Sequence, residues 1–302
     1  MSAVFNFTFV PWFRSVAPYI HMHRGKTFVV GIAGEAIAAG KLPAIAQDLA
    51  LIQSMGVKIV LVHGFRPQVN EQLQAKGHEA KYSNGIRITD SVALDCAQEA
   101  AGQLRYEIEA AFSQGLPNTP MAGATVRVVS GNFITARPVG VIDGVDFKHS
   151  GVVRKLDVAS ISRNLDFGSM VLLSPFGFSP TGEAFNLTME EVATSVATSL
   201  QADKLIFLTE VPGIRMRPGE PEAEDNPIDT ELPLDVAEKL LSALPAAQTP
   251  QDTAFYLQHC VKACKSGVER SHILPFAVDG SLLLEVYAVS YTHLTLPTKR
   301  IV

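Results

Sequence analysis

A buried strand that runs into a glycine turn and then a helix is the feature that most limits what this chain can fold into. Residues 57–73 read VKIVLVHGFRPQVNEQL, and the run at 59–62 (IVLV) is apolar, β-branched and short enough for one buried strand. His63-Gly64 ends that strand, and the pattern after it predicts a helix with Pro67 in its first turn. Strand, turn and helix form half of a βαβ unit, and open parallel sheets bind ligands beyond the carboxyl ends of their strands. The turn at residues 63–66 (HGFR) is therefore the first candidate for a binding site.

Further strands and helices alternate along the chain. We expect strands at residues 27–32, 170–173, 204–209, 272–276 and 282–286, and helices at 42–55, 158–165, 188–200, 233–244 and 252–267. Thr89 or Asp90 is expected to cap another helix that ends near residue 112. This alternation predicts an α/β fold, a three-layer α/β/α sandwich around a central, mainly parallel sheet.

A β-hairpin excursion interrupts the alternation. Asn84-Gly85 lies between two short β-like runs and predicts a tight hairpin. Residues 124–155 predict further hairpins or a small antiparallel sheet, whereas residues 174–186 and 217–226 predict loops.

Charge and cysteine content limit the partners and the compartment. The chain has 302 residues, a net charge of −5 and no basic run, which argues against binding to nucleic acid or an anionic membrane. It contains no apolar run of about 18 residues that would span a bilayer. The N-terminus lacks the features of a signal peptide. Three cysteines are too few for a disulfide scaffold, so we expect a cytoplasmic protein.

Two groups of residues leave their role open at this stage. Residues 9–20 predict an apolar helix with Trp12, Val16 and Ile20 on one face, which packs either on its own domain or on another subunit. Cys260 and Cys264 lie four residues apart beside His259, and small core residues explain this pair better than a metal site.

Three glycine-bearing turns follow predicted strands, at residues 31–35, 63–66 and 174–181. Backbone amides in such turns can hold phosphate or carboxylate, but none of the three matches a P-loop or a dinucleotide-binding fingerprint. Phosphoryl transfer needs cations at the phosphates, and here the turns offer only Arg66. Arg87, next to the predicted hairpin, either clamps a carboxylate or is a solvated surface residue.

The chain resembles the amino-acid kinase family, and within it the two-domain bacterial N-acetylglutamate synthases, from about residue 13 to residue 287. The motifs that carry the resemblance are PYI at 18–20, HRGKTF at 23–28, GEAI at 34–37, RPQ at 66–68, IRITD at 86–90, VSGNFI at 129–134, DGVD at 143–146, HSG at 149–151, TGE at 181–183, FNLT at 185–188, VKAC at 261–264 and SGV at 266–268. The resemblance implies a carbamate kinase-like fold. It also implies a parent protein that makes N-acetyl-L-glutamate from acetyl-CoA and L-glutamate, the first step of arginine biosynthesis.

Departures from the kinase pattern bear on activity. Where kinase relatives carry a lysine in the first turn, this chain has Gly31, and Tyr256 stands near the place of their second lysine. Loss of both lysines removes the charge neutralisation on which phosphoryl transfer depends. The resemblance therefore implies a vestigial kinase-type substrate site made of Gly34, Gly64, Arg66, Arg87 and Asn186.

In synthases of this type the kinase-like domain forms oligomers and binds L-arginine as an allosteric inhibitor. By position, the arginine site implied here comprises Tyr19, Lys204, His272 and Glu285. A guanidinium prefers a carboxylate fork, which Glu285 can supply, and the carboxylate of the ligand prefers donors such as Lys204.

The resemblance divides the chain into three parts. Residues 1–22 are expected to be an oligomerisation helix segment, and residues 23–287 the regulatory domain. Residues 288–302 match no preceding pattern and resemble a translated cloning or sequencing-adapter tail in place of an acetyltransferase domain. We therefore expect no catalytic residue, metal or cofactor in this chain, acetyl-CoA belonging to the full-length enzyme. The alternatives are an active N-acetylglutamate kinase and a ligand-free assembly module that forms a homo-oligomer.

Overall fold

A central sheet organises the chain. The computed structural model describes residues 4–114, 122–123, 125–211, 232–243, 253–287 and 294–297. Within these residues the sheet has the strand order β15-β14-β13-β1-β2-β10-β5. The strands are β1 (Thr27–Ile32), β2 (Lys58–His63), β5 (Val128–Val129), β10 (Met170–Leu173), β13 (Lys204–Thr209), β14 (Arg270–Pro275) and β15 (Leu294–Pro297). All neighbours pair in parallel except β15, which runs antiparallel to β14, so the predicted mainly parallel sheet is confirmed.

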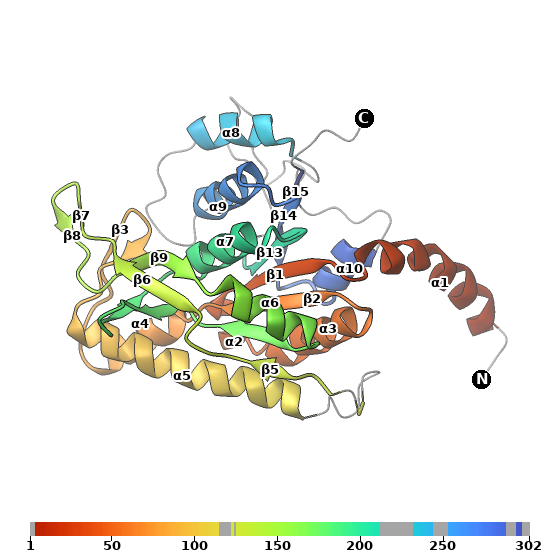
Figure 1. Cartoon of the computed structure of the whole chain (residues 1–302), viewed down its shortest axis with the longest axis horizontal. Helices are drawn as coiled ribbons and strands as arrows, with labels where there is room; N and C mark the ends of the chain where they lie inside the picture. The colour runs from red at the N-terminus through yellow and green to blue at the C-terminus, as the bar shows by residue number, and fades with distance from the viewer. Residues whose placement is uncertain are drawn as a thin grey trace.

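Helices cover both faces of this sheet (Figure 1). One face carries α6 (Val158–Asp166), α7 (Met189–Leu200) and α9 (Thr253–Lys265), with α8 (Leu234–Ala243) packed outside α9. The other face carries α2 (Gly34–Ala38), α3 (Leu42–Ser54), α4 (Arg66–Ala75), α5 (Ser91–Ser113) and α10 (Ser281–Tyr287). The three-layer arrangement predicted from the sequence is therefore confirmed.

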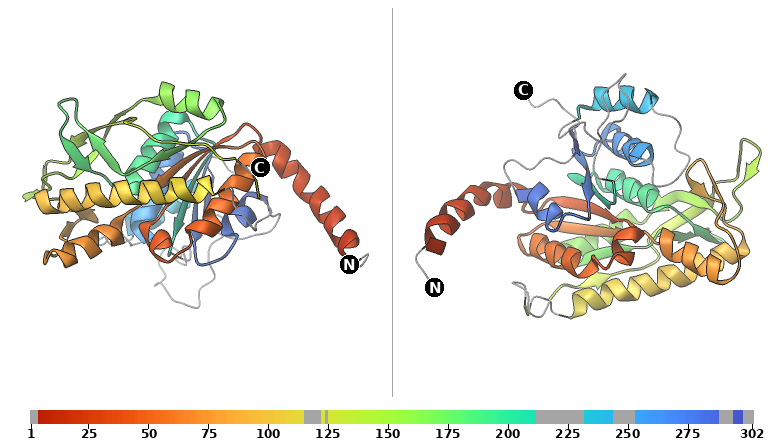
Figure 2. Two further views of the ribbon diagram at one scale, coloured as in Figure 1. Left: turned by 90° about the horizontal axis from the view of Figure 1, so that it is seen from below. Right: turned by 180° about the vertical axis from the view of Figure 1, so that it is seen from behind.

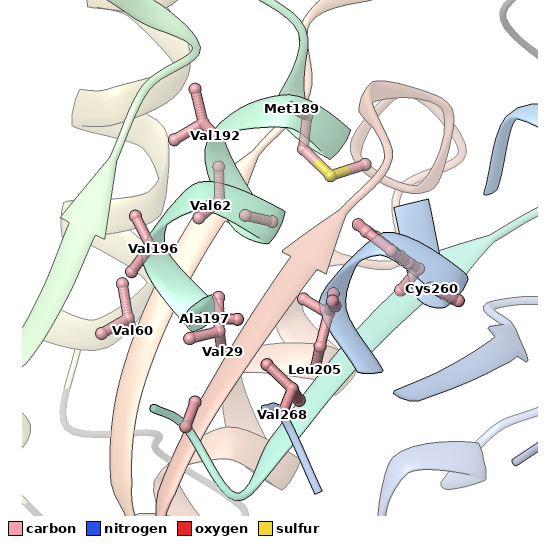
Figure 3. Packing of buried hydrophobic residues seen from close by; sticks show 14 of the residues in the cluster. Val29, Val60, Val62, Met189, Val192, Val196, Ala197, Leu205, Cys260 and Val268 are labelled. Carbon is pink, nitrogen blue, oxygen red and sulfur yellow. The ribbon is translucent and has the colours of Figure 1, made fainter. Parts of the chain in front are cut away.

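Strand alternation builds one core on each face. Val29 and Val60 point to the α7 side, whereas Val30 and Leu61 point to the α3 side. Successive side chains of a strand alternate between faces, so continuous apolar runs supply both cores at once. Figure 3 shows the valines of β1 and β2 packed against α7, which contributes Val196.

A second, mixed sheet and two antiparallel hairpins form the predicted excursion. A second sheet has the order β12-β11-β6-β9, from β6 (Ile134–Pro138), β9 (Gly151–Leu156), β11 (Phe176–Phe178) and β12 (Ala184–Asn186). Two hairpins add β3 (Tyr82–Ser83) with β4 (Ile86–Arg87), and β7 (Val141–Ile142) with β8 (Val145–Asp146). At the tip of the first hairpin Asn84 has φ 50° and Gly85 φ 74°, the left-handed pair that Asn-Gly turns supply.

Two element predictions were wrong. The segment 174–186, predicted as a loop, contains β11 and β12, because β6 supplies β11 with a backbone partner from a distant part of the chain. The segment 282–286, predicted as a strand, lies in helix α10. Leu282 and Val286, four residues apart, are both buried, and a short apolar run does not distinguish strand from helix by periodicity.

The N-terminal helix is longer than predicted. α1 (Val4–His23) contains both Pro11 and Pro18 in its interior and projects from the rest of the molecule (Figures 1 and 2). Val16 is buried, but Trp12 on the predicted face is 59% exposed. The stripe is thus only partly covered by this chain, and contact with another subunit stays a prediction.

Within the described residues no helix has the length and apolar character needed to cross a membrane. The predicted loop at 217–226 lies outside the described residues, as does most of the segment 288–302.

Candidate functional site

A cavity lies where the carboxyl ends of β1 and β2 meet the start of α7. It encloses about 510 Å³ of empty space, part of it open to solvent. All five residues predicted for the vestigial kinase-type site line it, namely Gly34, Gly64, Arg66, Arg87 and Asn186. Gly34, Gly64 and Arg66 follow β1 and β2, which end at the same edge of the parallel sheet. Arg87 reaches the cavity from the hairpin strand β4, and Asn186 reaches it from β12 of the second sheet.

Two glycines allow the turns after β1 and β2 to touch. A Cβ on Gly64 would lie 2.8 Å from the backbone nitrogen of Gly34. A Cβ on Gly34 would lie 2.9 Å from Oε1 of Gln68 and 3.0 Å from the backbone nitrogen of Phe65. Backbone atoms cannot move aside cheaply, so both positions require glycine. Close approach, rather than a positive φ, is the reason.

An internal ion pair occupies the floor of the cavity. Nη2 of Arg66 lies 2.7 Å from Oε1 of Glu190, and Nη1 lies 3.8 Å from Oε1 of Glu35. Burial opposes the charge of Arg66, but the Glu190 carboxylate outweighs it, and the pKa of Arg66 is raised. Burial, reinforced by Glu190, also raises the pKa of Tyr256. The charge of Arg66 is thus already neutralised, which leaves it poorly suited to hold phosphate.

Sequence reasoning missed the role of Glu190. Glu190 lies in the first turn of α7, where the helix dipole favours an acidic residue. Its side chain, however, is completely buried against Arg66, 124 residues earlier in the chain. Glu190 and Glu191 stand side by side in the first turn of α7, and no local signal in the sequence tells which of the two pairs with a distant arginine.

Arg87 and Asn186 belong to one hydrogen-bonded network. Arg87 is only 6% exposed and stacks over the ring of Tyr82 at 4.9 Å, so the solvated alternative for this arginine is wrong. The Ser150 hydroxyl donates to the carbonyl of Arg87 and lies 2.8 Å from Oγ1 of Thr89. Oγ1 of Thr89 in turn accepts a 3.0 Å bond from Nδ2 of Asn186. The network thus fixes the backbone of Arg87 and the side chain of Asn186, whereas the guanidinium of Arg87 packs against Tyr82.

Gly31 has no room for the lysine that kinase relatives carry. A Cβ at this position would lie 2.5 Å from Sδ of Met189 and 2.9 Å from Cδ1 of Phe207. Met189 reaches this point from the first turn of α7 (Figure 3). The ring of Phe207 in turn packs edge-on against Tyr256, the residue near the place of the second lysine. Apolar side chains thus fill the space beside Gly31.

We expect Gly31→Ala to lower the free energy of unfolding by about 1–3 kcal/mol, because overpacking forces neighbours off their rotamers. Gly102→Ala is the matched control. Gly102 lies in the interior of α5, and a Cβ added there would have no neighbouring atom within 4 Å, so helix propensity should make the change neutral or slightly stabilising. Urea unfolding measures both variants, and equal effects at the two positions would contradict the filled space beside Gly31.

A second cluster joins three of the four residues predicted for arginine. Nδ1 of His272 lies 2.9 Å from Oε1 of Glu285, and Nζ of Lys204 lies 3.2 Å from Nε2 of the same histidine. Burial and then the neighbouring Lys204 lower the pKa of His272 to about 4. Burial lowers the pKa of Lys204 to about 8, although Glu285 opposes the shift. A neutral His272 therefore donates from Nδ1 to Glu285 and accepts from Lys204.

The fourth predicted residue, Tyr19, lies half-buried on α1 and packs against the core that contains α10. A residue that the sequence prediction omitted links the same elements. Nε2 of His23, in the last turn of α1, lies 3.2 Å from the carbonyl of Val286 in α10. The position of His23 in the HRGKTF motif is the sequence feature that could have predicted its role.

The structure places the His259, Cys260 and Cys264 group in the core. Both cysteines are buried among apolar residues, and Nδ1 of His259 lies 3.1 Å from the hydroxyl of Thr194. Within the described ranges, no group of three or more His, Cys, Asp or Glu side chains is arranged to hold a metal ion. The core interpretation of the cysteine pair is confirmed.

The fold and the cavity define a member of the amino acid kinase family, whose model matches residues 26–275, and the chain belongs to that family. The more specific likeness is to amino-acid acetyltransferases. The protein of that name from Ralstonia nicotianae is 56% identical over 279 residues, covering 92% of this chain and 60% of the relative. The one from Vibrio cholerae is 46% identical over 284 residues, covering 92% of this chain and 62% of the relative. The chain thus spans about 60% of the length of these relatives.

Solved structures agree with this likeness. N-acetylglutamate synthase from Neisseria gonorrhoeae, crystallised with coenzyme A and L-arginine, superposes with a TM-score of 0.85 at 37% identity, covering 97% of this chain and 66% of that one. Carbamate kinase from Giardia lamblia, bound to AMP-PNP, gives a TM-score of 0.64 at 16% identity over 91% of this chain and 99% of that one, which supports the fold alone. The predicted carbamate kinase-like fold is confirmed.

Proposed function

We propose that this chain is the arginine-sensing regulatory part of an N-acetylglutamate synthase, which transfers acetyl from acetyl-CoA to L-glutamate in the full-length protein. The observation that carries the proposal is the buried row Lys204–His272–Glu285 between β13, β14 and α10. The Neisseria structure supports it, because that synthase was crystallised with both coenzyme A and L-arginine.

The chemistry of the row suits arginine. Glu285 presents a largely buried carboxylate, with 9% of its side chain exposed, which is the partner that a guanidinium prefers. Lys204 supplies an ammonium close by for the carboxylate of the ligand. A carboxylate and an ammonium at opposite ends of one row match the two charged ends of an amino acid that carries a cationic side chain.

Kinase activity is the weaker alternative. The space beside Gly31 is filled by Met189 and Phe207, and Arg66 is already paired with Glu190. Phosphoryl transfer is catalysed almost entirely by positioned positive charge, and the charge of Arg66 in this cavity is already compensated by Glu190. ATP-dependent phosphorylation of N-acetylglutamate by the purified chain would revive this alternative.

Calorimetric titration of L-arginine, with L-lysine as the control ligand, tests the proposal. We expect saturable binding of L-arginine that Glu285→Gln weakens at least tenfold, because a charge-assisted bidentate pair is lost. Glu269→Gln is the matched control, since it removes the same charge from an exposed position next to β14. Absence of L-arginine binding to the folded chain would favour the ligand-free assembly module instead.

Assembly and location belong to the same proposal. We infer that α1, with Trp12 and Phe13 each at least half exposed, contributes to a homo-oligomer in the cytoplasm. Removal of residues 1–20 is then expected to reduce the mass measured by light scattering, and an unchanged mass would contradict a role for α1 in assembly.

A further inference from the structure

We propose that Asn84 is a site of covalent modification, at which deamidation through a cyclic imide yields aspartate and isoaspartate in the folded chain. Asn84 and Gly85 form the tip of the β3–β4 hairpin, whose Tyr82 and Arg87 line the cavity. The inference rests on this turn and does not depend on arginine sensing. Its failure would leave the proposed function untouched.

The reaction needs only water as a co-reactant, with hydroxide as the base. The backbone nitrogen of Gly85 loses its proton and attacks Cγ of Asn84. A nitrogen–carbon bond forms while the Cγ–Nδ2 bond breaks, and ammonia leaves. Water then opens the five-membered imide. Breaking the bond between the Gly85 nitrogen and Cγ gives aspartate, whereas breaking the bond between that nitrogen and the backbone carbonyl carbon of Asn84 gives isoaspartate. Nothing is oxidised or reduced, and each product carries one carboxylate that the parent lacks.

The residue that follows Asn84 favours this attack. Glycine has no Cβ, so no side chain on residue 85 shields its backbone nitrogen from the amide carbon of Asn84. Among the described residues, no hydrogen bond involves the side chain of Asn84 or the backbone nitrogen of Gly85. Asn84 is also exposed, which admits the water and hydroxide that the reaction uses. Both reacting groups are therefore available.

The hairpin is short enough to open locally. β3 and β4 have two residues each and form a sheet of their own. A two-stranded hairpin is marginally stable in water, so local opening takes the turn through conformations from which the imide can close. The left-handed backbone, with φ 50° at Asn84 and 74° at Gly85, is thus held only by a weak pairing.

A second hairpin provides an internal comparison. The turn between β7 and β8 has Asp143-Gly144 at its tip, with φ 51° and 79°, and its strands also have two residues each. Both hairpins lie at the end of the molecule away from α1 (Figure 1). An ionised carboxylate is a much poorer target for a nitrogen nucleophile than an amide is. The imide is therefore expected to form far more slowly at Asp143 than at Asn84.

Isoaspartate changes the hairpin more than aspartate does. It runs the main chain through the side-chain carbon and so adds one atom to the turn, and turn length sets the register of a hairpin. The pairs Tyr82–Arg87 and Ser83–Ile86 are then lost. Because the guanidinium of Arg87 stacks over the ring of Tyr82, the change reaches the wall of the cavity. Aspartate keeps the main chain and adds only a negative charge.

Incubation of the full folded chain in mildly alkaline buffer, followed by peptide mapping with mass spectrometry, tests the proposal. Asn132 is the matched control, because it is also exposed but precedes Phe133 instead of a glycine. We expect Asn84 to be converted at least tenfold faster than Asn132, and at least tenfold faster than Asp143 is isomerised. The rate at Asn84 is expected to rise with pH, because the attacking nitrogen must lose its proton.

Two outcomes of this experiment would overturn the proposal. If Asn84 stays intact in the folded chain while the same chain in urea is converted, the fold protects the turn. Equal rates at Asn84 and Asn132 in the folded chain would show that the Asn-Gly turn has no special reactivity.

Hydrogen exchange tests the effect on the hairpin. The backbone nitrogen of Ile88 donates to the carbonyl of Lys81 at 2.8 Å, next to the paired residues. Anion-exchange chromatography separates the converted chains by their added charge, and Asn84→Asp is the control that adds this charge without the extra main-chain atom. We expect the Ile88 amide to exchange at least fivefold faster in the isoaspartate chains than in Asn84→Asp. Equal exchange in the two would contradict the loss of register.

Discussion

Replacing Arg66 with methionine is expected to lower the free energy of unfolding by about 3–5 kcal/mol, the usual cost of breaking a buried ion pair from one side. The variant leaves Glu190 completely buried, with its nearest cation removed. Glu35, at 3.8 Å from the same guanidinium, would add repulsion between carboxylates once the arginine is gone. The carboxylate must then either remain charged in an apolar place or take up a proton, and both cost stability.

Urea unfolding monitored by circular dichroism measures this effect. Arg105→Met is the matched control, because Arg105 forms an exposed pair with Glu109 one helical turn away, and such pairs contribute about 0.2–1 kcal/mol. The double variant Arg66→Met/Glu190→Leu is expected to recover most of the loss, since the completely buried carboxylate is removed together with its partner. If the free energy of unfolding of Arg66→Met lay within about 1 kcal/mol of the parent value, the Arg66–Glu190 pair would not hold α4 against α7.

Acidification from pH 6.5 to pH 4 is expected to destabilise the chain strongly through buried histidines. Burial lowers the pKa of His63 to about 4, and the pKa values of His23 and His272 are lowered to the same range, from 6.5, with burial as the main cause. Between these pH values the unfolded state binds protons that the folded state excludes, so stability present above pH 6.5 is lost as the pH falls. Each shift of this size corresponds to about 3 kcal/mol.

The histidine variant His63→Gln isolates one of these contributions. Nε2 of His63 lies 2.7 Å from the hydroxyl of Ser174, and an amide replaces that contact without titrating. We expect the slope of the unfolding free energy against pH, between pH 6.5 and 4, to correspond to about one proton fewer taken up on unfolding than in the parent. Asp48 works in the opposite direction, because burial and then Asp279 raise its pKa to about 6, and the measurement includes this contribution equally in both proteins. An unchanged slope would show that His63 takes up its proton at the same pH in the folded and the unfolded state.

Local sequence patterns were sufficient to predict the secondary structure of segments that carry a strand or turn signal of their own. The β-branched run at residues 59–62 ends at Gly64, and Asn84-Gly85 is a strong turn signal, so β2 and the first hairpin were predicted correctly. The segment 282–286 fails this test, because apolar residues in a short run suit a strand and a helix equally well. Packing of α10 beside α3 decided between them.

The candidate sites divide in the same way. The resemblance predicted the five residues that line the cavity, and it predicted three residues of the second cluster. Only Gly34, Gly64 and Arg66 among them lie in turns after strands of the parallel sheet. Their partners were not predictable. Glu190 carries no sign in the sequence that it neutralises Arg66, and Met189 carries none that it fills the space beside Gly31.

The sequence by itself therefore determined most of the alternation of strands and helices, the parallel sheet and the edge at which a site forms, because these follow from periodicity and turn chemistry over a few residues. Only the tertiary structure decided which charges are paired, which polar side chains are buried and which glycines have neighbours at van der Waals distance. Those properties depend on contacts between residues more than a hundred positions apart, such as Arg66 and Glu190 at a separation of 124. Long-range contacts of this kind leave no periodic trace in the chain.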